Sequence, residues 1–198
     1  YAISGIIASG KSLIIDGVEF TGIKEYGIRI SSLGGNLTIR NCYVHDMRYK
    51  TNTAEAAIFC YVVAGQSGSK GNFIFDNNKI IETSYSNQDF LCGAGGVFLS
   101  NNNGDKSSAI ITNNIFEGLG KSSDTITYSA YIRGTWDSVT INSNVFRNYY
   151  ECAVSVRDSN NVEIVGNVFK DALEGYTDGR EQQMGAINYQ PSANSTGS

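Results

Sequence analysis

Long apolar runs and an excess of basic residues are both missing from this sequence of 198 residues. No run approaches the roughly 18 apolar residues of a membrane-spanning helix, so we expect no transmembrane segment. The 15 lysines and arginines face 19 aspartates and glutamates, which gives a net charge of −4 and leaves no basic stripe for nucleic acid. Helical periodicity does not extend beyond about two turns. These absences argue against a membrane span, a nucleic-acid partner and a helical fold.

Proline, histidine and tryptophan occur once each, and the four cysteines lack the spacings of a metal site. Cys42, Cys60, Cys92 and Cys152 form no CxxC pair and no Cys/His metal motif. We therefore expect buried or half-buried free thiols and no metal; a disulfide is the alternative, and the sequence does not give its pairing. The chain opens on Tyr1 inside an apolar segment, with no start methionine or signal peptide, so we expect a piece of a longer mature protein.

The sequence does contain a repeat of β-branched residues, then Asn, then Val-Phe or Ile-Phe. The copies are "AIITNNIF" (109–116), "VTINSNVF" (139–146), "VEIVGNVF" (162–169) and, more loosely, "NFIFDNNKI" (72–80). Aligned, they give one column of Val18, Cys42, Asn78, Asn114, Asn144 and Asn167, and a second of Phe20, Val44, Ile80, Phe116, Phe146 and Phe169. Members of the first column lie 24, 36, 36, 30 and 23 residues apart. A minimum period near 23 residues with variable insertions is typical of a solenoid.

A weaker motif between the copies starts on a small residue and then alternates apolar with variable positions. It reads "YGIRI", "AAIFCY", "GGVFLS", "SAYIRG", "CAVSVR" and "GAINYQ". Three short strands per repeat predict an all-β right-handed parallel β-helix of about six coils, as a fragment of a longer helix. Residues 1–190 should form this single domain and residues 191–198 a polar tail. Leucine-rich and hexapeptide solenoids are disfavoured, since neither LxxLxLxxN nor a period of six is present.

The repetition follows from the way such coils stack. Each strand pairs with its equivalent about 4.8 Å away, so equivalent side chains form rows. The Phe column predicts an apolar row, and the inward Asn column predicts a ladder of amide hydrogen bonds worth on the order of 1 kcal/mol each. Asn also tolerates a left-handed backbone, so we expect this column to form the sharp turn itself. Its role should be structural and not catalytic.

These repeats resemble the pectate-lyase-like superfamily, whose turns carry asparagine ladders. The resemblance runs from Leu13 to about Gln190 and is specific for the fold, while it says little about activity. The superfamily includes pectate lyases, chondroitinase-B-like and alginate lyases, polygalacturonases, epimerases, phage tailspikes and adhesins. In the resembled lyases, the substrate groove lies on the sheet that corresponds to the weaker motif.

Long insertions flank that sheet on both sides. Connections are long after Val44, Ile80, Phe116 and Phe169, and again at "VVAGQSGSKG" (62–71) and "NNNGDKSS" (101–108). Loops that rise on two sides of a flat sheet predict a cleft between them.

Alternation along the strands predicts which side chains face this cleft. One outward row reads Arg29, Phe59, Phe98, Tyr131, Ser155 and Asn188, and the next reads Ser31, Tyr61, Ser100, Arg133, Arg157 and Gln190. Arg133 and Arg157 should be neighbours that bind a uronate carboxylate, because a guanidinium group fits a carboxylate with two hydrogen bonds. Arg29 and the aromatic members would bind the sugar rings. The alternative is a solvated face whose arginines pair with Asp137, Glu151 or Asp158.

Further candidates border the cleft. His45 and Arg48, in "YVHDMRY" (43–49), join Arg133 and Arg157 as catalytic candidates, and a surface His–Asp pair is the alternative for His45. Trp136 and Asp137 follow in "RGTWDS" (133–138) as further substrate-binding candidates, because an exposed Trp there would be a sugar platform; for Trp136, packing against the coil edge is the alternative.

Calcium binding would need clustered carboxylates, and the two outward rows contain no Asp or Glu. This departs from the calcium-dependent pectate lyases, and the lack of a Lys in these rows departs from the chondroitinase-B-like enzymes. We expect no cofactor; Ca²⁺ is the alternative, without a clear carboxylate cluster to hold it.

Two functions fit these features. The first is a polysaccharide-lyase-like enzyme acting on an acidic, uronate-containing glycan, with Tyr131 as a further acid–base candidate. The second is a non-catalytic structural or carbohydrate-binding segment of a phage tailspike or surface adhesin. Both imply a carbohydrate polymer as partner and a location outside the cell, on its surface or on a virion. Solenoid ends expose unpaired strand edges, so flanking domains or oligomer formation would cap them.

Overall fold

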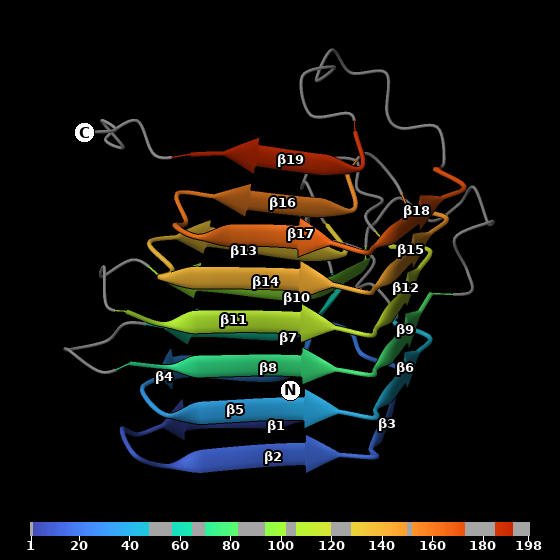
Figure 1. Ribbon diagram of the computed structural model, residues 1–198. Coiled ribbons are helices and arrows are strands. Elements are labelled where there is room, and N and C mark those ends of the chain that lie inside the picture. The colour runs from blue at the N-terminus through green and yellow to red at the C-terminus, as the bar shows by residue number, and fades with distance from the viewer. Residues whose placement is uncertain are drawn as a thin grey trace, which may run out of the picture.

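The computed structural model describes residues 2–47, 57–64, 70–82, 94–101, 106–119, 128–149, 152–172 and 185–191. These residues form nineteen strands and no helix, wound into successive coils of three strands (Figure 1). The all-β solenoid of about six coils that the repeats predict is therefore confirmed. The long insertions, Arg48, Cys92, Glu151 and the tail after residue 191 lie outside the described residues.

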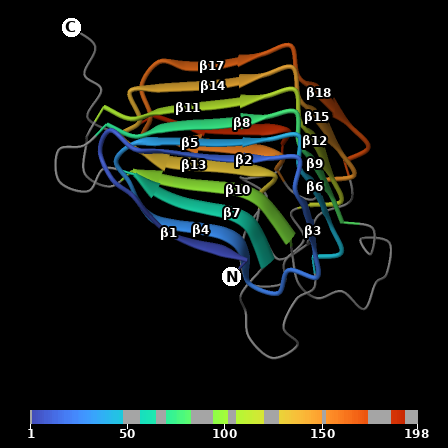
Figure 2. The ribbon, with the colours of Figure 1, turned by 90° about the horizontal axis from the view of Figure 1, so that it is seen from below.

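Every strand pairs in parallel with its equivalent in the neighbouring coil, which gives three sheets. The first sheet contains β1 (Ile3–Ile7), β4 (Tyr26–Leu33), β7 (Ala57–Ala64), β10 (Ala94–Asn101), β13 (Ala130–Gly134), β16 (Val154–Arg157) and β19 (Ile187–Gln190). The second contains β2 (Ser12–Asp16), β5 (Asn36–Arg40), β8 (Asn72–Asp76), β11 (Ser108–Thr112), β14 (Ser138–Asn142) and β17 (Val162–Val165). The third contains β3 (Glu19–Thr21), β6 (Tyr43–His45), β9 (Lys79–Ile81), β12 (Ile115–Glu117), β15 (Val145–Arg147) and β18 (Val168–Lys170). Viewed along the stack of coils, the sheets enclose the core on three sides (Figure 2).

The Phe column forms an inward apolar row, as predicted. The rings of Phe116 and Phe146 stack with centroids 5.0 Å apart and an interplanar angle of 5°. Phe169 continues the stack at 5.0 Å from Phe146, and it is only partly buried because it belongs to the last three-strand coil. Stacked aromatic pairs of this kind contribute about 0.5–1.5 kcal/mol beyond the burial of their area.

The Asn column forms the predicted ladder between the second and third sheets. Each Oδ1 atom accepts the backbone N–H of the equivalent residue one coil earlier, from Cys42–Asn78 through Asn144–Asn167, at 2.8–2.9 Å. Each Nδ2 atom donates to a backbone carbonyl of the preceding coil, for example Asn144 to Ile111 at 2.9 Å. Asn78, Asn114 and Asn144 are at most 1% exposed, so these bonds satisfy amides that would otherwise be buried without partners.

The left-handed turn falls one residue earlier than predicted. The positive φ angles occur at Gly17, Asn41, Asn77, Asn113, Ser143 and Gly166, with values between 52° and 66°. The ladder residues follow directly and do not adopt this backbone. Outside the turn, Asn77 donates to Asn41 and Asn41 donates to Asp16, so a second, exposed row of amides runs beside the buried one. One position therefore forms the left-handed turn and the next forms the buried ladder, whereas the sequence analysis assigned both roles to the ladder position.

Three of the four cysteines are buried free thiols, as expected. Cys42, Cys60 and Cys152 are at most 2% exposed and form no disulfide. Burial raises the pKa of the Cys60 thiol strongly and that of Cys42 to a smaller extent. These thiols pack as small apolar side chains.

We predict that Asn144→Leu lowers the free energy of unfolding by roughly 1–3 kcal/mol, because it leaves the Asn114 amide and the Ile111 carbonyl without partners. The measurement is chemical denaturation followed by circular dichroism. Asn160→Leu, at an exposed position before β17 where the side chain has no hydrogen bond to a described residue, is the matched control and should change stability by about 0.5 kcal/mol or less. Equal effects of the two substitutions would contradict the buried ladder as a main source of stability.

Candidate functional site

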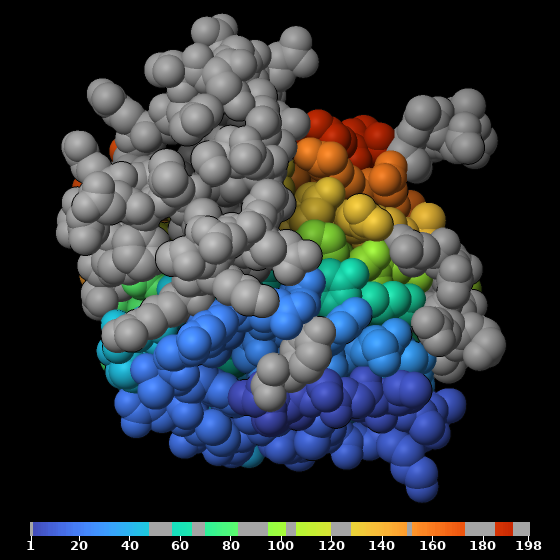
Figure 3. Space-filling model, turned by 180° about the vertical axis from the view of Figure 1, so that it is seen from behind, coloured from blue at the N-terminus to red at the C-terminus, as the bar shows by residue number. Residues whose placement is uncertain are grey.

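The outer face of the first sheet carries a row of side chains with three successive aromatic rings at its centre. Arg29 pairs with Tyr61, Tyr61 with Phe98, and Phe98 with Tyr131 in the strand register. Ser155 and then Asn188 continue the row on the last two strands. Figure 3 looks onto this face, where the described residues of successive coils form a continuous band. In-register stacking has thus built an outer row in the same way as the inner ones.

The rings of this row touch along the solenoid. Tyr61 and Phe98 stack with centroids 4.9 Å apart and an angle of 19°, and Phe98 meets Tyr131 edge-on at 4.9 Å. Two further rings extend the row sideways, Tyr26 at 5.3 Å from Tyr61 and Tyr128 at 5.0 Å from Tyr131. Tyr61, Phe98 and Tyr131 are only half-buried, so each ring keeps an exposed part beside the neighbours that it contacts.

The sequence analysis missed Tyr26 and Tyr128, although a signal was present. Each lies three residues before a member of the row, Arg29 or Tyr131, so both occupy the same position in their coils. Comparison of that position across the repeats would have found them.

Phe59 is a correction, because its side chain is fully buried and does not face the cleft. Phe59 and Cys60 both point inward at a bend of β7, and Tyr61 takes the place in the outer row. The ring packs 5.1 Å from Phe20 and fills the position that Gly27 occupies in the preceding coil. A Cβ atom on Gly27 would lie 2.8 Å from the Phe59 ring, so the large residue depends on the neighbouring glycine. The prediction assumed that inward and outward residues alternate from the small residue at the start of the motif. It therefore assigned Phe59 to the outer row, two residues before its actual member, Tyr61.

Arg133 and Arg157 are direct neighbours on β13 and β16, as predicted. The Arg133 guanidinium lies over Phe98, 5.9 Å from the ring centroid, and that of Arg157 lies over Tyr131 at 5.4 Å. Among the described residues, neither arginine forms an ion pair with an acidic side chain, including Asp137 and Asp158. In the described structure, both charges therefore have a cation–π contact in place of an ion pair.

The two arginines differ in hydrogen bonding. Arg133 Nε donates to Ser100 Oγ at 3.4 Å, whereas Arg157 Nε is buried and has no hydrogen-bond partner within the described ranges. On the next strand, Asn188 Nδ2 is likewise buried without a partner. Beside them, burial raises the pKa of Tyr128 to about 12, and the charge of Arg157 offsets only part of that rise. This end of the row therefore holds unsatisfied donors and a phenol that stays protonated at neutral pH.

Trp136 is a second correction. It is fully buried, and its Nε1 atom donates to the Arg133 carbonyl at 3.1 Å, so it is part of the core and not a sugar platform. The turn at Gly134, with φ of 88°, directs the chain inward after β13. Asp137 is exposed and immediately precedes β14, beyond the outer rows of the first sheet. Its predicted role in substrate binding stays a prediction.

His45 lies on the third sheet, away from the aromatic row. Its Nε2 atom is 2.9 Å from Glu19 Oε1 and its Nδ1 atom is 2.9 Å from Asp46 Oδ2. The imidazole also stacks on Tyr43, with centroids 4.6 Å apart. The hydrogen bonds to Glu19 and Asp46 raise the pKa of His45, which favours the charged imidazolium. The surface His–Asp pair considered as the alternative is present, and Glu19 joins it.

Other predicted features lie outside the described residues, namely Arg48 and the long insertions that would form the walls of a cleft. Within the described ranges, no group of three or more His, Cys, Asp or Glu side chains is placed to hold a metal ion. The same part of the chain contains no helix that is long and apolar enough to cross a membrane.

The raised pKa of His45 predicts a pH-dependent stability. The folded chain binds the imidazolium proton of His45 more tightly than the unfolded chain does. The stabilisation from this proton is therefore complete below the ordinary pKa of about 6.5, and it is lost as the pH rises through the pKa of the folded state. Between about pH 6 and pH 9, the melting temperature of the wild type should therefore fall more than that of His45→Gln. Since the chain has one histidine, NMR titration of its ring protons gives the folded pKa directly, and Glu19→Gln should lower it. A pKa of His45 at or below 6.5 in the folded protein would contradict the hydrogen bonds between its ring and the carboxylates of Glu19 and Asp46.

Comparison with known proteins agrees with this architecture. The family model for a right handed beta helix region matches residues 2–179, nearly the whole chain. No curated protein and no solved structure matches the chain. With parallel strands in three stacked sheets and a match over this length, the chain belongs to the right-handed β-helix family.

Proposed function

We propose that the outer face of the first sheet binds an acidic, uronate-containing polysaccharide, and that the chain acts on it outside the cell, or on a virion, as a polysaccharide-lyase-like protein. The observation that carries the proposal is the pair Arg133 and Arg157, side by side over aromatic rings and without an acidic partner in the described structure.

The charges of this pair favour an anionic ligand. Neighbouring strands lie about 4.8 Å apart, so two guanidinium groups in one row repel each other unless a negative charge comes between or above them. The guanidinium groups carry only hydrogen-bond donors, and a carboxylate offers only acceptors. A uronate carboxylate would therefore supply both the negative charge and the acceptors.

The aromatic row favours a ligand that extends along the solenoid. Tyr61, Phe98 and Tyr131 follow one another at 4.9 Å, so a glycan lying along the row would contact the exposed parts of successive rings. The row ends at Tyr131, beneath Arg157. Sugar rings would thus pack on the aromatic half of the site and present a carboxylate to the arginines on the other half.

A β-elimination would use this arrangement as follows. A base removes the proton at C5 of the uronate, the electron pair forms the C4–C5 double bond, and the C4 oxygen leaves with a proton. The arginines would stabilise the negative charge that builds up on the carboxylate as the C5 proton departs. Tyr131, whose ring contacts Arg157, is the acid–base candidate that the geometry favours over His45 on the third sheet.

The second candidate function is glycan binding without catalysis. In the two outer rows, the described titratable side chains are arginines and tyrosines, with no Lys, His, Asp or Glu among them. A binding surface needs only the rings and the positive charges, so this composition favours the stalk or adhesin function considered above.

We predict that Arg133→Ala and Arg157→Ala each weaken binding of an acidic oligosaccharide by about 1–3 kcal/mol, the range for a charged hydrogen-bonded group. The double variant should lose less than the sum, because the two arginines serve one carboxylate. A glycan array would identify the ligand, followed by calorimetric titration at fixed salt. Arg40→Ala, at an exposed ion pair on the second sheet, is the matched control and should bind like the wild type. Equal affinity of all the variants would move the site away from this face.

Incubation with uronate polysaccharides separates the two functions. A lyase releases an unsaturated product that absorbs in the ultraviolet, and Tyr131→Phe should abolish this signal while binding is retained. Binding by the wild type with no release of unsaturated product from any bound polysaccharide would support the non-catalytic function.

A further inference from the structure

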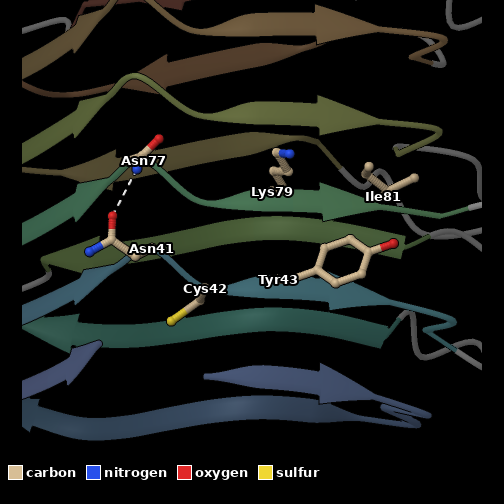
Figure 4. Close-up of a pocket in the computed structure, with 6 residues that line it drawn as sticks. All are labelled: Asn41, Cys42, Tyr43, Asn77, Lys79 and Ile81. Atoms are coloured by element: carbon tan, nitrogen blue, oxygen red, sulfur yellow. Dashed lines mark hydrogen bonds between the residues drawn. The ribbon is translucent and has the colours of Figure 1, made fainter. Parts of the chain in front are cut away.

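We infer that a hollow on the third sheet is a second sugar-binding site, separate from the first sheet. The hollow has a volume of about 540 Å³ and is lined by Asn41, Cys42, Tyr43, Asn77, Lys79 and Ile81. Figure 4 shows the two asparagines at one side, Tyr43 and Ile81 at the other, and Lys79 between them. These residues come from the left-handed turn and from β6 and β9 of two adjacent coils.

Tyr43 provides a fixed aromatic platform in this hollow. Its side chain is 40% exposed, although its ring stacks on His45 at 4.6 Å and 25°. His45 is itself held on both nitrogens, by Glu19 and Asp46 at 2.9 Å each. The ring is therefore positioned before any ligand arrives, which lowers the entropy cost of stacking a sugar on it.

Three polar groups of the hollow have no hydrogen-bond or ion-pair partner in the described part of the chain. They are the ammonium group of Lys79, the hydroxyl group of Tyr43 and the Oδ1 atom of Asn77.

The Oδ1 atom of Asn77 lacks a partner because the exposed row of amide hydrogen bonds is interrupted after this residue. Asn77 Nδ2 donates to Asn41 at 2.7 Å, but in the next coil Asn113 donates to Asp76 and not to Asn77. The row therefore ends at the acceptor of the exposed Asn77, two residues before Lys79 in the chain. Because the Nδ2 atom of Asn77 is held by Asn41, this acceptor is also fixed in direction.

This set of groups matches a sugar ring better than it matches a simple ion. One hydroxyl group both accepts and donates a hydrogen bond, so adjacent sugar hydroxyls would pair with the Lys79 donor and the Asn77 acceptor together. The apolar face of the ring would stack on Tyr43. A simple anion would meet one cation only, and a metal ion would lack carboxylate ligands within the hollow.

Isoleucine methyl NMR tests the site, because Ile81 lines the hollow. The folded wild-type chain, labelled at its isoleucine methyl groups, would be titrated with a galacturonate oligosaccharide and, separately, with a neutral xylose oligosaccharide. Ile81 is assigned through Ile81→Val, and Ile110 on the second sheet serves as the control signal. We expect the Ile81 signal to shift with at least one probe while the Ile110 signal stays fixed. A response to the acidic probe alone, or to both, supports the site and shows whether Lys79 requires a carboxylate.

Variants separate this site from the one on the first sheet. Tyr43→Ala should weaken the titration at Ile81 by roughly five- to tenfold, and Lys79→Gln should also weaken it, whereas Lys170→Gln at an exposed position of β18 should not. Arg157→Ala should leave the Ile81 titration unchanged, whether or not the first sheet binds a glycan. No shift at Ile81 with either probe, or equal titrations for Lys79→Gln and the wild type, would overturn the inference even if Tyr43→Ala failed to fold.

Discussion

Each side chain in this solenoid must share its row with the equivalent side chains of the coils above and below, about one strand spacing away. Inside the coil, this constraint makes Asn144 the partner of Asn114 and Asn167, and makes the Phe146 ring stack on Phe116. A residue that differs from its neighbours needs a compensating change beside it. Phe59 shows this, because its ring occupies space that Gly27 leaves open. Register therefore controls both stability and the residues that each row can contain.

On the outer faces, each side chain also lies beside its equivalents in the neighbouring coils, but there the stability of the fold does not require the residues of a row to be similar. Side-by-side guanidinium groups at Arg133 and Arg157 repel each other, and each has a cation–π contact, with Phe98 or Tyr131, but no acidic partner in the described structure. Inward rows of Asn and Phe are explained by the energy of the fold. The energy of the fold does not explain two adjacent positive charges, one of which has a buried donor without a partner. Unfavourable groups of this kind are more frequent at binding sites.

The sequence predicts rows well where coils are short and strands alternate regularly. Arg133 and Arg157 are 24 residues apart, close to the minimum period, and their pairing follows directly. The prediction was wrong for Phe59 because two adjacent residues point inward at a bend, which alternation does not anticipate. The exposed platform at Trp136 was also wrong and the alternative, packing against the coil, holds, because the turn at Gly134 and not a repeat directs this side chain inward. Glu19 escaped notice as a partner of His45 because only the coil stacking brings these two residues together.

A solenoid of three sheets also separates its surfaces from one another. The first and third sheets share a close-packed core of fixed rows, and a change of side chain on one outer face has no direct path to the other except through that core. Substitutions at Arg157 and at Tyr43 alter groups on different sheets, in coils that share no strand pair. Their effects on ligand binding should therefore add, as effects of distant and independent sites do, whereas Arg133 and Arg157 in one row should not. Departure from additivity between the two faces would mean either that one glycan chain contacts both or that the shared core transmits the change.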